Sequence, residues 1–448
     1  MSNEILHKNR NGCALHGALK VVNAIDGLVP IIHSTAGCSI QSKQSENFLT
    51  GNNGLFHRGW REVPATAVFE KQVVFGGSSR LREQIKNTVK VQAADLYVVV
   101  SGCAPELVGD DVPAMVKEGQ DQNFPVISVL TPGFKGNVYK GYEWAVKSIL
   151  DRIAFKTIDF TKQKGLVNIL GVVPNQDIFW EGNLEEIRKI LSQIGLQANT
   201  LLGYDQSKEN WKKVPNAELN VVVSPWGLEA AKQLETKFGT PYLYLGYIPV
   251  GSPDTSKFIE LLGEKLKVSK ELIEKVISEN EKQLTYQLSK LAQTYLSFDF
   301  QKEIALVGET SNVLGISRFL QESFGQIVTT VIITDEPEIE LRQQIKDTLP
   351  VNASFDTHVI FSSNGKEIDD VLRNAKPQLI LGSSLEQNVA KELSVSLIKI
   401  ASPVFDSLFL NHSYTGYSGA VNLLQDFSGA ILKNIAHSKK KIYKSQSK

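Results

Sequence analysis

The chain has 448 residues, too many for a single hydrophobic core, so two or three domains are expected. Hydrophobic residues make up 42% and charged residues 21%, as in ordinary globular proteins, and 48 basic residues balance 48 acidic ones. This balance gives no reason to expect a nucleic acid as partner. The opening "MSNEILHKNR" lacks the apolar core of a signal peptide, and no apolar run reaches the roughly eighteen residues of a membrane span. We therefore expect a cytoplasmic protein without membrane contact.

The first segment, residues 1–160, alternates strand-like and helix-like patterns. Its short apolar runs predict strands at 27–34, 96–102 and 125–132, and the pattern at 78–91 predicts a helix. This segment holds all three cysteines and four of the seven histidines. We predict that it forms an N-terminal α/β domain that carries the cysteines.

The second segment, residues 161–298, continues the alternation. Strands are predicted at 165–174, 219–225 and 240–246, and helices at 183–196, with Asn183 as the N-cap, and at 227–239. Residues 269–297 contain neither Gly nor Pro and predict one long helix. We predict a second α/β domain that ends in this connector helix.

The third segment, residues 299–448, repeats the order once more. The predicted strands are 303–309, 327–334, 357–363, 378–384 and 396–402, and the predicted helices are 312–325 and 419–436, followed by a basic tail. Alternating strands and helices imply parallel sheets that are covered by helices on both faces. The predicted fold class is therefore α/β, with three Rossmann-like domains, each a parallel sheet flanked by helices.

The three cysteines are the most informative residues of the first segment. Cys38 and Cys103 each follow an apolar strand by way of a turn that contains glycine, and Cys13 precedes a helical pattern. Ligands of open parallel sheets bind beyond the carboxyl ends of the strands, so the sheet can bring Cys38 and Cys103 to one place. Cys13, 25 residues before Cys38, is close enough along the chain to join them.

Three converging thiols predict a soft metal centre. Iron–sulfur clusters use thiolate ligands and commonly need four, so the fourth would be a non-cysteine group or would come from another chain. Zinc is less expected, because the chain has no CxxC pair. The spacing alone leaves one alternative open, namely three buried and inert thiols, since free cysteines are among the most buried residues. An odd number of cysteines in so long a chain is no disulfide framework.

Several short motifs match the pattern of one protein family in order and spacing. They are Cys13 followed by Gly17-Ala18, "HSTAGC" at 33–38, "VVFGGSSRL" from Val73, and Cys103 followed by Glu106 and "VGDD" at 108–111. The match continues to "PVFDSLFLNHSYTGYSGAVNLL" near the C-terminus and so spans nearly the whole chain. On these residues the chain resembles the nitrogenase component 1 superfamily. This superfamily includes the subunits of the nitrogenase catalytic component, a cofactor-assembly scaffold and related tetrapyrrole reductases.

The resemblance implies a cofactor and two partners. It implies that Cys13, Cys38 and Cys103 ligate an iron–sulfur cluster at the interface with a partner subunit that supplies its own thiolates. The cluster would be an [8Fe-7S] P-cluster or a [4Fe-4S] cluster. The implied partners are an α-type component 1 subunit, in an α2β2 tetramer, and an ATP-dependent iron–sulfur reductase. The chain itself has no GxxxxGK[ST] sequence, so we expect no ATP hydrolysis on it.

The chain resembles the β-type subunit more than the α-type subunit. It has no cysteine beyond Cys103, whereas the α-type subunit holds its active-site cofactor on a further cysteine in the second domain. The C-terminal tail is also similar to the β-type, although "VVFGGSSRLREQI" is closer to α-type and scaffold sequences. Two residues depart from the family pattern: Ser34 replaces the first Gly of its His-Gly-x-x-Gly-Cys motif, and Gly133 replaces a serine that can ligate the oxidised cluster in many β-type subunits.

The expected function follows from this resemblance. We expect an electron-transferring subunit of a nitrogenase-like reductase, which passes electrons from the ATP-dependent reductase to an active site on the partner subunit. Its substrate could be dinitrogen or another reducible compound such as a tetrapyrrole. The alternatives are a scaffold subunit for metallocofactor assembly and a redox-inert structural partner.

Four further residues are expected around the cluster. His16 and His33 flank the first two cysteines and could tune the cluster through hydrogen bonds to sulfur, although simple packing is the alternative for both. Gly102 and Glu106 flank Cys103 and are expected in the same surroundings.

Other polar residues have plainer interpretations. Asp110 and Asp111 stand where "VPAMVKE" begins, and both are expected to cap that helix. His412 is expected to be a packing or interface residue. The Gly-rich segment 51–60 could face a substrate or a partner, or form an ordinary surface loop.

Overall fold

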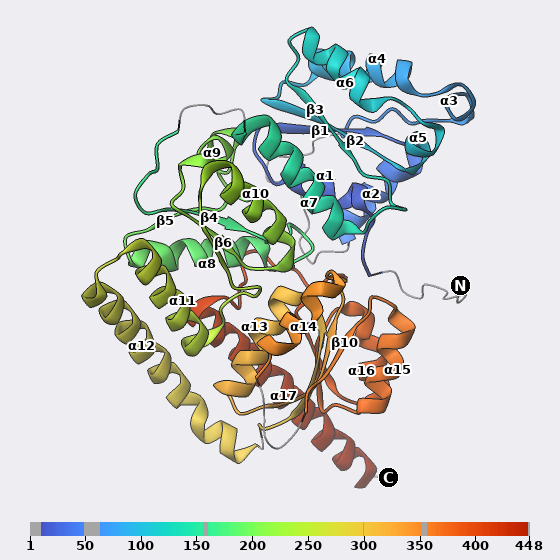
Figure 1. Cartoon of the computed structure of the whole chain (residues 1–448). Coiled ribbons are helices and arrows are strands. Elements are labelled where there is room, and N and C mark those ends of the chain that lie inside the picture. Colours follow the sequence, from blue (N-terminus) through green and yellow to red (C-terminus); the bar gives the residue numbers. More distant parts are fainter. Residues whose placement is uncertain (1–9, 49–62, 156–159, 299, 351–355, 447–448) are drawn as a thin grey trace. The chain divides into compact units, whose positions relative to one another are not determined.

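The structure is a computed structural model, and it describes residues 10–48, 63–155, 160–298, 300–350 and 356–446 (Figure 1). The chain divides into two compact units. The N-terminal unit comprises the described parts of Asn11–Asn175 and Gln197–Tyr244. The C-terminal unit comprises the described parts of Met1–Arg10, Gln176–Leu196 and Leu245–Lys448.

Helices alternate with strands through both units, as the sequence predicted. The α-helices are α1 (Ala14–Asn23), α2 (Ala36–Phe48), α3 (Glu70–Phe75), α4 (Ser78–Val91), α5 (Cys103–Val108), α6 (Val112–Asp121), α7 (Val138–Ile149), α8 (Trp180–Gln193), α9 (Lys208–Lys212), α10 (Leu228–Phe238), α11 (Gly251–Leu266), α12 (Lys270–Ser297), α13 (Thr310–Glu322), α14 (Ile339–Thr348), α15 (Gly365–Ala375), α16 (Gln387–Leu393) and α17 (Gly416–Gln446). Within the described residues, none of these helices is both long and apolar enough to span a membrane.

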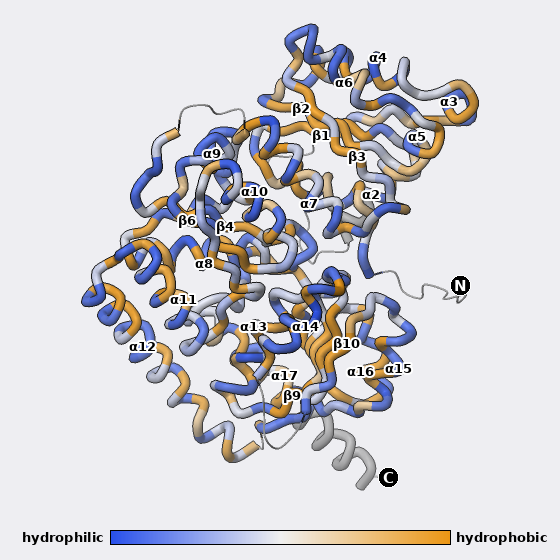
Figure 2. Tube along the Cα trace, viewed as in Figure 1, coloured by the Kyte–Doolittle hydropathy of each residue, from blue (hydrophilic) through white to orange (hydrophobic). Residues whose placement is uncertain are grey.

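The first sheet lies in the N-terminal unit and positions the cysteines. Its strands are all parallel, in the order β1 (Leu28–His33), β2 (Leu96–Ser101) and β3 (Val126–Leu130). Every residue of β1 and β2 is buried, and for this reason their sequences are apolar runs rather than alternating patterns. Figure 2 shows these strands as strongly hydrophobic segments. Helices α4 and α6 pack against the sheet through a core that includes Ile31, Ile85 and Val99.

The second sheet, also in the N-terminal unit, contains a ladder of buried amides. Its strands are parallel, in the order β5 (Gln197–Asn199), β4 (Leu166–Leu170), β6 (Leu219–Val222) and β7 (Tyr242–Tyr244). Asn199 donates to Asn168 Oδ1 at 2.9 Å, and Asn168 donates to Asn220 Oδ1 at 2.9 Å. The ladder therefore links three neighbouring strands through side chains as well as through the backbone.

The third sheet lies in the C-terminal unit and has five parallel strands. Their order is β10 (His358–Phe361), β9 (Ile327–Ile333), β8 (Glu303–Gly308), β11 (Leu379–Gly382) and β12 (Ser396–Lys399). The predicted fold class is thus confirmed, because each segment contributes one parallel sheet with flanking helices (Figure 1). The domain boundaries that we predicted at residues 160 and 298 stay predictions.

Helix α8 begins earlier than the sequence predicted, so Asn183 is not its N-cap. The helix starts at Trp180, after Asp177 has accepted a hydrogen bond from the backbone N–H of Phe179 at 2.9 Å. Asn183 lies inside the helix and is fully buried. Its amide donates to Asp177 Oδ2 at 2.8 Å and accepts from the hydroxyl of Ser413 at 2.8 Å. The polar residue that resembled a cap therefore holds two distant segments of the C-terminal unit together.

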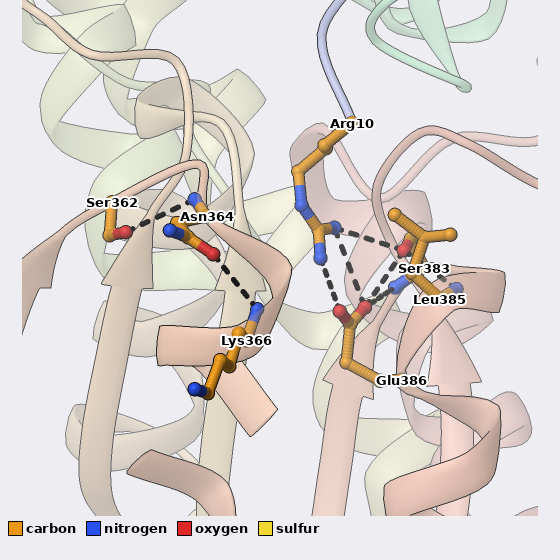
Figure 3. A network of polar contacts seen from close by, with 7 residues as sticks. All are labelled: Arg10, Ser362, Asn364, Lys366, Ser383, Leu385 and Glu386. Atoms are coloured by element: carbon orange, nitrogen blue, oxygen red, sulfur yellow. Dashed lines mark hydrogen bonds and ion pairs between the residues drawn. The ribbon is translucent and has the colours of Figure 1, made fainter. Parts of the chain in front are cut away.

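Arg10 joins the beginning of the described chain to the third sheet. Its guanidinium donates to Ser383 Oγ at 2.9 Å and pairs with the carboxylate of Glu386, and both charged side chains are 1% exposed (Figure 3). Burial alone would raise the pKa of Glu386, but the charge of Arg10 and the hydrogen bonds from Ser383 outweigh it and hold that pKa below its usual range. Figure 3 also shows Asn364, which caps α15 by accepting from the backbone N–H of Lys366 at 3.0 Å.

Replacing Arg10 by alanine is expected to lower the free energy of unfolding of the C-terminal unit by about 3–5 kcal/mol, because the buried Glu386 carboxylate would lose its countercharge. Chemical denaturation of the two proteins measures this difference. Lys270→Ala is the matched control, since its ion pair with Glu274 has side chains that are 89% and 65% exposed and should contribute nothing measurable. Equal losses in both variants would contradict the interpretation of Arg10.

Candidate metal centre

Each cysteine lies at the N-terminal end of a helix. Cys13 is the N-cap of α1, Cys38 is the third residue of α2, and Cys103 opens α5. Strands β1 and β2 are parallel and pair up to their last residues, His33 and Ser101. The segments that lead to Cys38 and Cys103 therefore both begin at the carboxyl ends of the strands. All three thiols are free and partly exposed. The first sheet therefore presents three thiols that a ligand could reach.

Gly133, in the loop after β3, brings Cys13 and Cys103 together. Its backbone N–H donates to Cys103 Sγ at 3.1 Å. A Cβ atom on Gly133 would lie 3.4 Å from Cys103 Sγ and 3.6 Å from Cys13 Sγ, so the two sulfur atoms are at most about 7 Å apart, the sum of these distances. The same Cβ atom would lie only 2.9 Å from the Cβ atom of Cys13. The glycine at this position thus leaves room for the two thiols to converge.

Ser34 connects the third cysteine to this group. Its hydroxyl donates to Cys38 Sγ at 3.1 Å. The same hydroxyl occupies the space into which a Cβ atom on Gly102 would point, and Gly102 directly precedes Cys103. Gly102 is therefore a spacer between the segments that carry Cys38 and Cys103, which is the physical reason for a glycine there.

The Cys13 thiol lies in a largely buried environment beside a histidine. Burial raises the pKa of Cys13, the backbone N–H groups of His16 and Leu15 oppose this, and the neighbouring Cys38 and Cys103 raise the pKa further. The His16 Nδ1 atom lies 3.1 Å from Cys13 Sγ. Burial, together with the charge of Lys20, lowers the pKa of His16 to about 4, so its imidazole is neutral at pH 7. His16 is thus in contact with the sulfur of Cys13, and its role in tuning a cluster stays a prediction.

His33 makes different contacts from those of His16. Its Nδ1 atom lies 3.1 Å from Thr66 Oγ1, and its Nε2 atom lies 3.1 Å from the carboxylate of Asp110. Burial lowers the pKa of His33, while Asp110 acts in the opposite direction. Both ring nitrogens thus have an oxygen atom as their hydrogen-bond partner, and among the described residues the ring forms no hydrogen bond to sulfur. His33 supports the loop that precedes Cys38 rather than the thiol itself.

The acidic residues after Cys103 have separate roles. Asp111 caps α6 by accepting from the backbone N–H of Ala114 at 3.0 Å, as predicted. Asp110 does not cap this helix, which corrects our expectation, because its carboxylate accepts from the backbone N–H of Gly77 at 2.6 Å and contacts His33. Glu106 accepts from the hydroxyl of Ser101 at 2.5 Å and so ties α5 to the end of β2.

The chemistry of this site fits an iron–sulfur cluster. Three thiols from three helix ends are the ligand type that such clusters use, and they leave at least one ligand to be supplied from elsewhere. Within the described residues, no three His, Cys, Asp or Glu side chains are arranged to hold one metal ion.

Sequence reasoning missed the two residues that organise the thiols. Gly133 and Ser34 each contact a cysteine sulfur, and the sequence marked them only as departures from the family motif. His412 is a packing residue, as expected, because its ring lies against Phe179 and its Nε2 atom pairs with Asp426 at 2.9 Å. The whole of segment 51–60, for which we considered a substrate or partner contact, lies outside the described residues.

Comparison with known proteins identifies the family of the chain. The family model for nitrogenase component 1 type oxidoreductases matches residues 13–432. The chain is 23% identical to a nitrogenase molybdenum-iron protein beta chain of Methanococcus maripaludis, over 94% of this chain and 93% of that protein. It is 24% identical to the nitrogenase iron-molybdenum cofactor biosynthesis protein NifE of Clostridium pasteurianum, over 94% of this chain and 88% of that protein.

A solved structure shows the same fold. The structure described as nitrogenase Cp1 at pH 6.5 aligns with a TM-score of 0.81, covering 97% of this chain and 95% of that chain at 21% identity. The fold, the motifs around all three cysteines and the family match over residues 13–432 lead to one conclusion. The chain belongs to the nitrogenase component 1 type oxidoreductase family, and it resembles the beta chains within it.

Proposed function

We propose that this chain is the β-type subunit of a nitrogenase-like reductase complex and that Cys13, Cys38 and Cys103 hold an iron–sulfur cluster which it shares with an α-type subunit. One observation carries the proposal: the three cysteines of the chain, far apart in sequence, come together at one edge of the first sheet around Gly133 and Gly102. Such a cluster, of the [8Fe-7S] or [4Fe-4S] type, accepts and passes on single electrons when it is bound.

The surroundings of the thiols support thiolate ligation. Cys103 accepts a backbone hydrogen bond from Gly133, and the Cys13 thiol is within reach of the His16 ring. Hydrogen bonds to ligand sulfur orient it and set the potential of a cluster. The proposed ligands are therefore held in place by the chain itself, whereas the missing ligands are assigned to the partner.

The surface beside Cys103 supports a partner subunit. Helix α3 contacts α5, and none of its residues is buried. Phe75 at the end of α3 is 82% exposed, and Leu107 on α5 is 73% exposed. Large apolar side chains that cluster on a surface mark an interaction site. We assign this surface to the α-type subunit, and an α2β2 tetramer served by an ATP-dependent iron–sulfur reductase follows from the same proposal.

A second candidate function is that of a scaffold subunit for the assembly of a nitrogenase-type metallocofactor. The similarity to NifE, a cofactor biosynthesis protein, favours it, because the identity of 24% is as high as the 23% with the beta chain. Both functions require bound iron. They differ in whether this chain takes part in substrate turnover.

The metal content of the protein tests both candidates against an inert role. The chain, purified without oxygen after co-expression with its α-type partner, is expected to be brown and to contain iron and acid-labile sulfide. Cys103→Ala is expected to lose most of that iron, because one of three ligands from this chain is removed. Ser39→Ala, next to Cys38 but without a thiol, is the matched control and should keep its iron. Full iron content in the Cys103 variant would overturn the ligand assignment.

A further inference from the structure

Ser34 is buried at the point where β1 ends and the segment to Cys38 begins. Its side chain is almost completely covered, with 1% of the residue exposed, and its hydroxyl donates to Cys38 Sγ at 3.1 Å. The family pattern has a glycine at this place, which could make no such bond. The hydroxyl of Ser34 is thus a hydrogen-bond donor to sulfur that this chain adds to the site.

The backbone and the neighbours of Ser34 fix the direction of its hydroxyl. The carbonyl of Ser34 accepts a hydrogen bond from the backbone N–H of Val68 at 2.9 Å, and this bond holds the backbone of Ser34 in place. The side chain fills the space over Gly102, which has no Cβ atom of its own to place there. Thr35 Oγ1 lies farther from the same sulfur, at 3.7 Å, so Ser34 provides the shorter of the two hydroxyl contacts. Because the side chain is already fixed, binding of a cluster would cost no further side-chain entropy at Ser34.

We propose that Ser34 is a positioning residue, and that its hydroxyl raises the reduction potential of the cluster bound by Cys38. A hydrogen bond donated to a thiolate draws electron density from the sulfur and stabilises the more negative, reduced form of the cluster. The inference rests on the proposed function, because it requires Cys38 to be a ligand. It assigns to this chain a tuning device for the energy at which its cluster accepts an electron.

The test is a redox titration of the complex with its α-type partner, in which the reduced cluster is followed by electron paramagnetic resonance. Ser34→Ala removes the hydroxyl and keeps the Cβ atom that packs over Gly102. We expect unchanged iron content and a lower midpoint potential. At a fixed potential near the midpoint, the ratio of oxidised to reduced cluster should rise about tenfold, which is 59 mV for a one-electron couple.

Ser42→Ala is the matched control, because the hydroxyl of Ser42 donates to the backbone carbonyl of the same Cys38 at 2.8 Å and not to its sulfur. This variant should keep the wild-type potential. Ser34→Thr, which retains a hydroxyl, should keep a midpoint potential close to that of the wild type. An unchanged potential in Ser34→Ala, or equal shifts in the Ser34 and Ser42 variants, would overturn the proposal.

Failure of this inference is distinguishable from failure of the proposed function. If Ser34→Ala keeps its iron but not the expected shift, the tuning role is wrong and Cys38 remains a ligand candidate. If Cys38→Ala keeps full iron, the ligand assignment itself is wrong. Loss of iron from both Ser34→Ala and Ser34→Gly would show that the hydroxyl holds the cluster in place rather than tuning it, and this would also overturn the proposal.

Discussion

Substituting Cys38 by alanine is expected to abolish substrate reduction by the complete complex of this chain, its α-type partner, the reductase and ATP. The chain has no cysteine beyond Cys103 on which an active-site cofactor of the α-type could be held, so its contribution would be to electron supply. Cys38 is one of only three thiols at the proposed cluster, and its loss removes a ligand. Turnover should fall to background, while binding of substrate to the partner is unchanged. Steady-state reduction rates and equilibrium binding, measured on the same preparations, test the two halves of the statement.

The outcome also separates the two candidate functions. Ser42→Ala, which changes a hydroxyl beside Cys38 without removing the thiol, should keep normal turnover. The isolated chain should reduce no substrate, with or without the reductase and ATP. If the Cys38 variant turned over normally in the complete system, the site would lie off the electron path. The scaffold function would then be favoured.

Replacing Gly17 by alanine is expected to destabilise the N-terminal unit by about 3 kcal/mol, the upper end of the usual range for an overpacked core. Gly17 on α1 has no room for a side chain, because a Cβ atom there would overlap the carbonyl oxygen of Val138 on α7. The contact is reciprocal, since a Cβ atom on Gly141 of α7 would overlap the carbonyl oxygen of Ala14. The two helices thus touch backbone to backbone, directly beside Cys13. Chemical denaturation measures the loss, and the iron content should fall with it.

Gly429 in α17 provides the control for this change. A Cβ atom on Gly429 would meet no atom within 4 Å, and the residue lies within a helix. Gly429→Ala should therefore leave stability unchanged or raise it by up to about 1 kcal/mol, through the better helix propensity of alanine. A Gly17→Ala variant as stable as the wild type would mean that α1 and α7 can separate without loss.

The sequence was sufficient for the strands and most helices because their signals are local. Apolar runs such as 96–102 are the direct consequence of strands buried on both faces, and the Gly- and Pro-free stretch 269–297 became α12 almost residue for residue. Strand β5 was missed, since three residues with an exposed first position carry no pattern that could be recognised. Convergence of Cys38 and Cys103 could be predicted, because parallel strands end at one edge of their sheet.

The finer geometry of the site could not be predicted, because it depends on contacts between residues far apart in the chain. Gly133 donates to a cysteine that precedes it by 30 residues, and His33 pairs with an aspartate 77 residues later. No periodicity or cap preference reports such pairs. Asp110 illustrates the consequence. Its place before a helix predicted a cap, but its carboxylate instead accepts from the backbone N–H of Gly77 and contacts the His33 ring.

The asparagine ladder of the second sheet restricts how this part of the protein can change during evolution. Asn168 both donates to Asn220 and accepts from Asn199, so a single change at Asn168 to an apolar residue would leave two buried amides without this partner. Replacing all three by apolar residues of similar shape would remove the polar groups together and cost far less than the sum of the single changes. The three positions should therefore vary as a group among descendants of this chain, with intermediates that carry one or two substitutions strongly disfavoured.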